Sequence, residues 1–123
     1  MTHKLLLVDD SGLARRGMRA IFERAGFDIV EAEDGMTALE RYFLEKPDVV
    51  ILDLVMKGMY GLDVLTKLRE LDPAARVVVV SADVQQSSQE LAEAAGAVAF
   101  INKPIDAQQV LSLVRGVLEG TTT

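Results

Sequence analysis

Three short runs of apolar residues, each ending at a polar residue, constrain the fold of this chain most strongly. The first run, residues 5–8, is followed by Asp9 and Asp10. The second, residues 49–52, is followed by Asp53, and the third, residues 77–80, by Ser81. Because successive positions are apolar, both faces of each run must be buried, as in parallel strands covered by helices. Weaker runs at residues 27–32 and 98–101 bring the number of predicted strands to five.

Helical patterns follow each of these runs, with apolar residues at spacings of three and four. The first predicted helix covers residues 11–25, and Gly26 stands where a left-handed cap is needed. Its predicted inner face comprises Ala14, Gly17, Met18, Ile21 and Ala25, and its predicted outer face comprises Arg15, Arg16, Arg19 and Glu23.

Four further helices are predicted from caps and breakers. Asp34 caps a helix carrying Leu39 and Phe43 that ends before Pro47, and Leu62, Leu65 and Leu68 define one that ends at Asp72 and Pro73. The fourth covers residues 83–95 and ends at Gly96. Asp106 caps the fifth, whose predicted apolar face comprises Ala107, Val110, Leu111, Val114, Val117 and Leu118.

The order of strand and helix, repeated five times, predicts an α/β fold. Short connections imply right-handed crossovers and an open, doubly wound parallel sheet. The length of 123 residues suits one domain, which we expect to cover residues 1–119. Residues 120–123 carry no pattern and are expected to form a loose tail.

Charge and composition narrow the partners. Thirteen basic and nineteen acidic residues give a net charge of −6, which disfavours direct binding to nucleic acid or to an anionic membrane. No apolar stretch approaches the length of a membrane span. The chain has no cysteine, which excludes disulfides and thiolate chemistry and agrees with a cytoplasmic location.

The chemistry is expected at the carboxyl ends of the strands, where ligands bind in such sheets. The side chains predicted to converge there are Asp9, Asp10, Asp53, Ser81 and Lys103. Neighbouring carboxylates resist joint ionisation, and a hard cation such as Mg²⁺ relieves their repulsion. An aspartate can accept a phosphoryl group, whose charge Mg²⁺, the Lys103 ammonium and the Ser81 hydroxyl would stabilise. These residues therefore predict phosphoryl transfer to Asp53.

The same motifs resemble the receiver domain of two-component response regulators. They are Asp9-Asp10, Asp53, Ser81-Ala82, and the run from Gly96 to Pro104 that ends in Lys103-Pro104. The resemblance extends from Lys4 to about Leu118. It implies a five-stranded flavodoxin-like (βα)5 fold with strand order 2-1-3-4-5. It also implies a signalling module, not an enzyme acting on other substrates.

The resemblance implies a role for each site residue. Asp53 is the expected phosphoacceptor, charged by a histidine kinase or a small phosphodonor. Asp10 and Asp53 are expected to bind Mg²⁺, with Asp9 acting partly through water and the Val55 carbonyl as a further ligand. The residues expected to contact the phosphoryl group or to switch with it are Lys103, Ser81 with Ala82, and Phe100. The Lys103-Pro104 bond is similar to one that the family holds cis.

The resemblance further implies a partner surface formed by the fourth helix, fifth strand and fifth helix. Single-domain chemotaxis regulators are the nearest functional analogy, with a motor or phosphatase protein as the downstream target. Phosphorelay or kinase-scaffold roles fit the same residues. The polar start of the fourth helix, residues 85–89, predicts weak packing and a responsive element, although a merely solvated helix explains it as well. Lys57 replaces a proline that many receivers carry, and Ser81 replaces the commoner threonine.

Other functional classes stay open. A haloacid-dehalogenase-type phosphatase also uses an aspartate nucleophile and Mg²⁺, but in an Asp-x-Asp arrangement that the adjacent Asp9 and Asp10 do not form. In a flavodoxin-like electron carrier, these two carboxylates would repel the FMN phosphate. A non-phosphorylated interaction module of the same fold is the third alternative.

Overall fold

A computed structural model describes residues 2–56, 60–82 and 85–120 of the chain. The strands are β1 (Lys4–Val8), β2 (Asp28–Ala32), β3 (Val49–Asp53), β4 (Val77–Ser81) and β5 (Ala99–Asn102). The helices are α1 (Gly12–Arg24), α2 (Gly35–Glu45), α3 (Gly61–Leu71), α4 (Gln86–Ala94) and α5 (Ala107–Glu119). All strand pairs are parallel, and the order β2-β1-β3-β4-β5 confirms the predicted doubly wound sheet.

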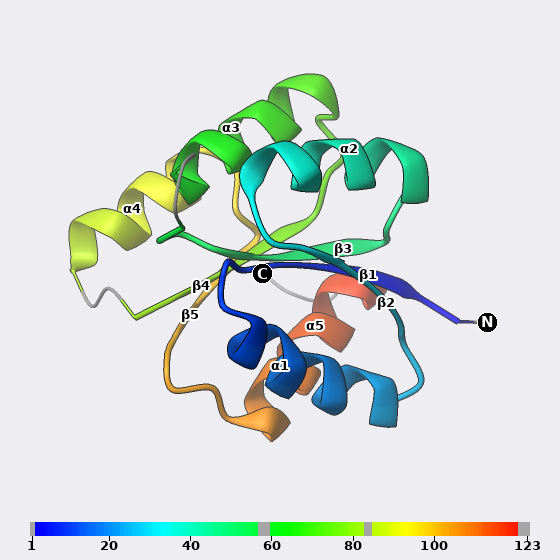
Figure 1. Ribbon diagram of the computed structural model, residues 1–123. Coiled ribbons are helices and arrows are strands. Elements are labelled where there is room, and N and C mark those ends of the chain that lie inside the picture. Colours follow the sequence, from blue (N-terminus) through cyan, green and yellow to red (C-terminus); the bar gives the residue numbers. More distant parts are fainter. Residues whose placement is uncertain (1, 57–59, 83–84, 121–123) are drawn as a thin grey trace.

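The sheet separates two layers of helices, with α1 and α5 on one face and α2, α3 and α4 on the other (Figure 1). Alternate residues of one strand enter opposite cores. Leu5 and Leu7 pack on the α1 and α5 side with Phe22, whereas Leu6 and Val8 pack on the other side with Leu65. This double burial explains why the strand sequences are apolar at successive positions.

The predicted caps Asp34, Asp106 and Gly26 are confirmed, and Ser11 caps α1 as well. Ser11 Oγ accepts a hydrogen bond from the Ala14 amide at 3.1 Å, and Asp34 Oδ1 accepts one from the Thr37 amide at 2.8 Å. Asp106 caps α5 through the Gln108 amide. Gly26 adopts a φ of 92°, the left-handed conformation that ends α1.

The predicted inner face of α1 is confirmed for Met18, Ile21 and Ala25, which pack against the core on this side of the sheet, but it missed the most buried residue. Phe22 is the fully buried residue of this helix, whereas Gly17 is exposed. Arg15, predicted to face solvent, has a side chain that is 17% exposed and contacts β2. Arg15 and Arg19 on one edge of the helix therefore reach Glu31 of the edge strand β2.

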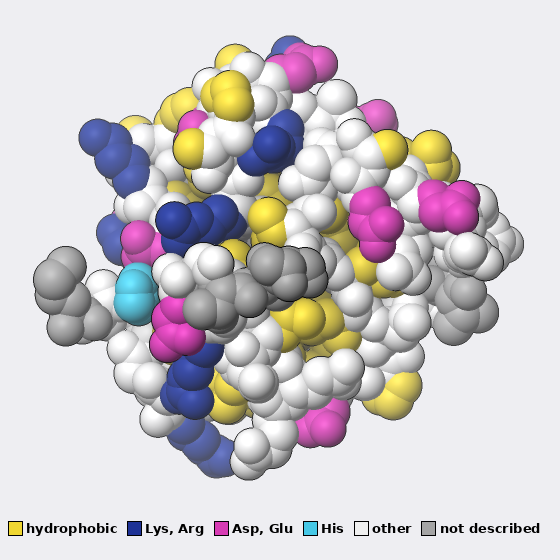
Figure 2. All heavy atoms as spheres, turned by 180° about the vertical axis from the view of Figure 1, so that it is seen from behind, with side chains coloured by type: hydrophobic (Ala, Val, Ile, Leu, Met, Phe, Trp, Pro, Cys, Tyr) yellow, Lys and Arg dark blue, Asp and Glu magenta, His cyan; other side chains and the backbone are white. Residues whose placement is uncertain are grey.

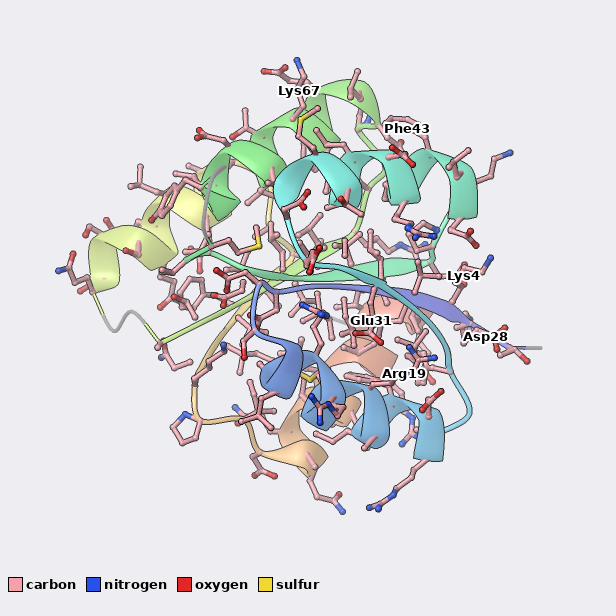
Figure 3. All side chains as sticks on the ribbon, viewed as in Figure 1. Lys4, Arg19, Asp28, Glu31, Phe43 and Lys67 are labelled. Carbon is pink, nitrogen blue, oxygen red and sulfur yellow. The ribbon has the colours of Figure 1, made fainter. Side chains whose placement is uncertain are left out.

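The prediction for the second helix also needs correction. Tyr42 is buried and its hydroxyl donates a hydrogen bond to Asp72 Oδ2 at 2.6 Å. Phe43 is 47% exposed and lies on α2 away from the sheet (Figure 3). On α5, Ala107 is exposed and Val110, Val114 and Val117 form the buried face.

Several element bounds differ slightly from the predictions. β2 begins at Asp28 and β5 covers Ala99–Asn102, each one residue later than its predicted start. Helix α4 covers Gln86–Ala94 instead of residues 83–95. Residues 83 and 84 lie outside the described residues, as do residues 121–123 of the predicted tail.

Candidate functional site

Three carboxylates meet at the carboxyl edge of the sheet. Asp9 and Asp10 directly follow β1, and Asp53 is the last residue of β3, which pairs with β1. One oxygen from each of the three carboxylates lies within 4.8 Å of the others. The predicted convergence of these side chains is therefore present.

Lys103 supplies a positive charge to this cluster. Its ammonium lies 3.3 Å from Asp9 Oδ2 and 3.3 Å from Asp53 Oδ2. The Lys103 amide donates a hydrogen bond to the carbonyl of Ser81 at 2.9 Å, and the Lys103-Pro104 bond is cis as expected. Burial lowers the pKa of Lys103, but the carboxylates of Asp53 and Asp9 outweigh burial and raise it overall.

Asp53 is held in a nearly buried position, with 8% of its surface exposed. The Val55 amide donates to its Oδ1 at 3.1 Å. Burial raises the pKa of the Asp53 carboxyl, opposed by the Val55 amide and Lys103, and the charge of Asp9 raises it further. The net pKa is above the ordinary value, so this carboxyl is harder to ionise than an exposed aspartate, and a further cation nearby would favour its ionised form.

This donor set suits a hard divalent cation. The three carboxylates provide oxygen ligands, and one ammonium leaves a formal charge of about −2 on the group. Mg²⁺ commonly binds through one or two carboxylates and retains several waters, and phosphate oxygens can replace some of these waters. Asp9, Asp10 and Asp53 could therefore hold Mg²⁺.

The remaining predicted site residues lie around the same edge. Ser81 is fully buried at the end of β4, and Ala82 after it is exposed. Phe100 in β5 is half-buried and packs against the core under α2, α3 and α4. The Val55 side chain is exposed, which leaves its backbone as the part able to serve the site. Lys57 lies outside the described residues.

Sequence reasoning missed Gly61, which brings α3 against the acceptor strand. The Gly61 amide donates to the Leu54 carbonyl at 2.9 Å. A Cβ atom at this position would collide with the Asp53 carbonyl and with backbone atoms of Leu54. The position therefore requires glycine on steric grounds, a need that the spacing of apolar residues does not reveal.

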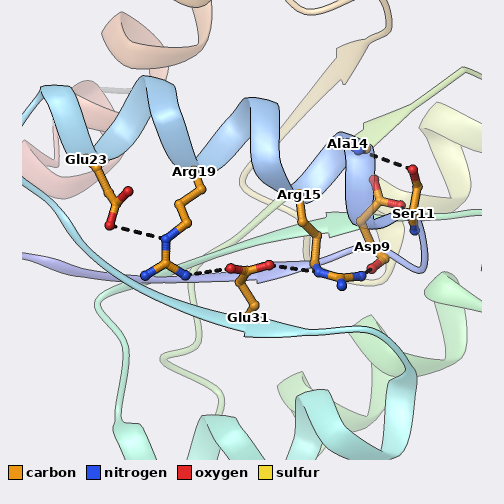
Figure 4. A network of polar contacts seen from close by, with 7 residues as sticks. All are labelled: Asp9, Ser11, Ala14, Arg15, Arg19, Glu23 and Glu31. Atoms are coloured by element: carbon orange, nitrogen blue, oxygen red, sulfur yellow. Dashed lines mark hydrogen bonds and ion pairs between the residues drawn. The ribbon is translucent and has the colours of Figure 1, made fainter.

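The contact between Arg15 and Asp9 was also missed. An Arg15 nitrogen, Nη1, donates to the backbone carbonyl of Asp9 at 2.6 Å, and the Ser11 amide donates to Asp9 Oδ1 at 2.9 Å (Figure 4). The helix that follows the acidic pair therefore also holds it in place.

A cavity of about 340 Å³ lies between α1 and the sheet beside this site. Apolar side chains of Met18, Ile21 and Ile105 line it, and Asp53 and Lys103 stand at its edge. Two small residues of α1, Ala14 and Gly17, also line it.

Comparison with known proteins identifies the family. Residues 5–115 match the response regulator receiver domain. The chain belongs to this family. The receiver is 39% identical to chemotaxis protein CheY of Bacillus subtilis (strain 168) over 119 residues, which cover 96% of this chain and 99% of the relative. It is 32% identical to sporulation initiation phosphotransferase F of the same strain over 122 residues, which cover 96% of this chain and 95% of the relative.

Solved receivers share its structure. A CheX-CheY-BeF3-Mg complex from Borrelia burgdorferi matches with a TM-score of 0.90 and 35% identity, covering 94% of this chain and 88% of that chain. The predicted receiver family and the fold class are thus confirmed, and the chain is a CheY-like receiver of two-component signalling.

Proposed function

We propose that this receiver accepts a phosphoryl group on Asp53 from a histidine kinase, in a Mg²⁺-dependent reaction, and changes conformation to control a partner protein. The observation that carries the proposal is the position of Asp53, which is nearly buried within a cluster of carboxylates and 3.3 Å from the Lys103 ammonium. This arrangement combines a nucleophile with charge that opposes the phosphoryl oxygens.

The proposed reaction is an in-line transfer. One oxygen of the Asp53 carboxylate forms a bond to phosphorus while the bond from phosphorus to the histidine nitrogen breaks, and the electron pair leaves with the imidazole. Lys103 neutralises charge on the transferred group, and the Val55 amide orients the nucleophile by its bond to Oδ1. Mg²⁺ would be held by Asp10 and Asp53, with Asp9 partly through water and the Val55 carbonyl, and would stabilise negative charge on the phosphoryl oxygens.

The response is proposed to pass through Ser81, Ala82 and Phe100 to α4. Of the nine residues in α4, Ser88 and Ala92 are buried, so little packing opposes its displacement. Phosphorylation would draw the Ser81 hydroxyl toward the phosphoryl group and Phe100 would follow it inward.

The proposed partner surface comprises α4, β5 and α5. Leu91 and Val98 are 56% and 42% exposed there, which offers an apolar contact. In the rear view, acidic side chains lie on the side of the molecule formed by α4, whose nine residues include Glu90 and Glu93 and no lysine or arginine (Figure 2). A partner with a basic rim around an apolar centre fits this surface. A target or phosphatase protein is the proposed class.

The net charge and the helix lengths bear on binding to nucleic acid and to membranes. The net charge of −6 disfavours nucleic acid and anionic lipid. Within residues 2–56, 60–82 and 85–120, every helix is too short or too polar to cross a membrane. We propose action in the cytoplasm.

The test is intact mass after incubation with acetyl phosphate and Mg²⁺. We expect the gain of one phosphoryl group, which is absent in EDTA and in an Asp53→Asn variant. Asp28→Asn, an exposed aspartate at the start of β2, is the matched control and should gain the group. A group that persists in Asp53→Asn, or no gain with either acetyl phosphate or phosphoramidate, would overturn the proposal. Steady turnover of a phosphate ester would indicate the phosphatase alternative.

A further inference from the structure

A chain of ion pairs joins α1 to the edge strand β2. Both oxygens of Glu31 accept from arginines of α1: Oε1 from Arg15 Nε at 2.8 Å and Oε2 from Arg19 Nη1. Arg19 Nε also pairs with Glu23 at 3.2 Å (Figure 4). Figure 3 shows Arg19 and Glu31 extending toward each other from the two elements. The Arg15–Glu31 end of this chain is its least exposed part, with side chains 17% and 30% exposed.

Arg15 has a second contact that reaches the acidic site. Its Nε faces Glu31 while its Nη1 donates to the Asp9 carbonyl at 2.6 Å. One guanidinium therefore connects a β2 carboxylate to the backbone of a residue in the carboxylate cluster. Figure 4 shows these contacts in a row along the inner edge of α1.

Asp9 is fixed at three points. Its amide donates to the Ala32 carbonyl at 3.2 Å, its Oδ1 accepts from the Ser11 amide at 2.9 Å, and its carbonyl accepts from Arg15. The remaining oxygen, Oδ2, faces the Lys103 ammonium. Arg15 and Lys103 contact Asp9 through their side chains, and of these two it is Arg15 that binds the backbone carbonyl, so a substitution of Arg15 removes this anchor without altering the backbone.

We propose that Arg15, itself oriented by Glu31, is a positioning residue that holds Asp9 in the geometry that binds Mg²⁺ and supports phosphorylation of Asp53. The inference rests on the proposed function and extends it to a pair of residues outside the carboxylate cluster. Partners that orient metal ligands commonly change metal affinity by 10- to 100-fold when they are removed.

The contact requires a guanidinium. Arginine presents several donors in a fixed plane, so Nε and Nη1 can serve Glu31 and Asp9 at once. A lysine has one nitrogen on a flexible chain and retains the charge without the two directed bonds. Arg15→Lys therefore separates positioning from simple electrostatics.

The test is Mg²⁺ affinity measured by titration calorimetry with MgCl₂ alone, beside the rate of phosphorylation by acetyl phosphate. We expect Arg15→Met and Arg15→Lys to weaken Mg²⁺ binding roughly tenfold, and Glu31→Gln to weaken it about threefold. Because Glu31 acts through Arg15, the double variant of Arg15→Met and Glu31→Gln should bind as Arg15→Met alone does.

Two controls distinguish positioning from general support of the fold. Arg19→Met removes the other ion pair of Glu31 and should lower the melting temperature while Mg²⁺ affinity stays within about twofold of the wild type. Arg16→Met, an exposed neighbour on the same helix, should change neither. Circular dichroism and thermal melting without Mg²⁺ establish that each variant is folded. If Arg15→Met does not fold, Arg15→Lys is the variant that tests the inference.

The outcomes are separable. Arg15 variants that bind Mg²⁺ as the wild type does would overturn the inference and leave the proposed function intact. Equal losses in Arg19→Met and Arg15→Met, or additive losses in the double variant, would also overturn it. A wild-type protein that neither binds Mg²⁺ nor becomes phosphorylated would overturn the proposed function itself.

Discussion

The Lys103 ammonium lies 3.3 Å from Asp53 Oδ2, although the two residues are 50 positions apart in the chain. The contact spans the carboxyl edge of the sheet from the loop after β5 to the end of β3. It gives the proposed phosphoacceptor a cationic neighbour from the protein itself, which Asp53 shares with Asp9.

Lys103→Met should slow phosphorylation of Asp53 roughly 100-fold, because it removes a charge that stabilises the transferred group. Mg²⁺ affinity should stay equal or increase, since a competing cation is lost. Stopped-flow phosphorylation with acetyl phosphate and calorimetry measure the two effects. Lys67→Met, on the outer side of α3 (Figure 3), is the control and should keep the wild-type rate. A Lys103→Met protein phosphorylated at that rate would contradict the proposed role.

Asp53→Asn should raise the melting temperature at pH 7 in EDTA by several degrees. The pKa of Asp53 is raised in the folded state, mainly by burial, so the folded protein holds this proton more tightly than the unfolded chain. The stability that this tighter proton binding contributes is present at pH values below the ordinary pKa of 3.8. It is lost as the pH rises through the raised pKa of the folded state. The difference in melting temperature between Asp53→Asn and the wild type should therefore become smaller at acid pH.

Calorimetric melting across this pH range measures the effect, with Asp28→Asn as control. Added Mg²⁺ should stabilise the wild type and leave Asp53→Asn nearly unchanged, because a ligand stabilises the state that binds it. Equal stabilisation of both proteins by Mg²⁺ would argue against Asp53 as a ligand.

Two glycine substitutions should have opposite effects. Gly17→Ala should increase the free energy of unfolding by about 1 kcal/mol, because the position lies within α1 and an added Cβ meets no atom of the structure within 4 Å. Gly61→Ala should decrease it by roughly 1–3 kcal/mol, because the added Cβ collides with the Asp53 carbonyl and Leu54. Urea unfolding measures both.

The same pair bears on function. Gly61→Ala should also slow phosphorylation, since relief of the collision moves the backbone that carries Asp53, whereas Gly17→Ala should leave the rate unchanged. A Gly61→Ala protein as stable as the wild type would show that α3 can shift without cost.

Tyr42→Phe should lower the melting temperature by several degrees, because the buried hydroxyl donates to Asp72 Oδ2 at 2.6 Å. This hydrogen bond is the main cause of the lowered pKa of Asp72. Its contribution to the stability of the fold is therefore present at pH values above the ordinary pKa of 3.8 and is lost as the pH falls through the lowered pKa of the folded state. Tyr60→Phe, at an exposed tyrosine, is the control. A difference that does not narrow at acid pH would exclude the Asp72 carboxylate as its cause.

Much of this fold was predictable because strand burial on both faces leaves a plain pattern. Strands β1, β3 and β4 alternate their side chains between two cores, and the residues at their ends meet because parallel strands share one carboxyl edge. Asp53 and Lys103 could therefore be assigned to one site before the structure was known. The resemblance to receivers supplied the roles that spacing leaves open, such as that of Phe100.

The positions of some side chains on the amphipathic helices were harder to predict. In α2, Tyr42 and Phe43 are adjacent aromatics, and the choice of the buried one depends on a partner 30 positions away, Asp72. In α1, Arg15 is long enough to reach β2 while its backbone remains on the helix edge. Contacts between distant polar residues leave no periodic signal in the sequence.

The acceptor strand β3 lies between β1 and β4, and all five of its residues are buried. Its amide hydrogens should therefore be among the last to exchange with deuterated water, whereas those of α4 should exchange early. Asp53 is the last residue of this buried strand. If Asp53 is phosphorylated as proposed, we expect the strand beneath it to stay in place and the response to be measured as a change in the exchange rates of α4.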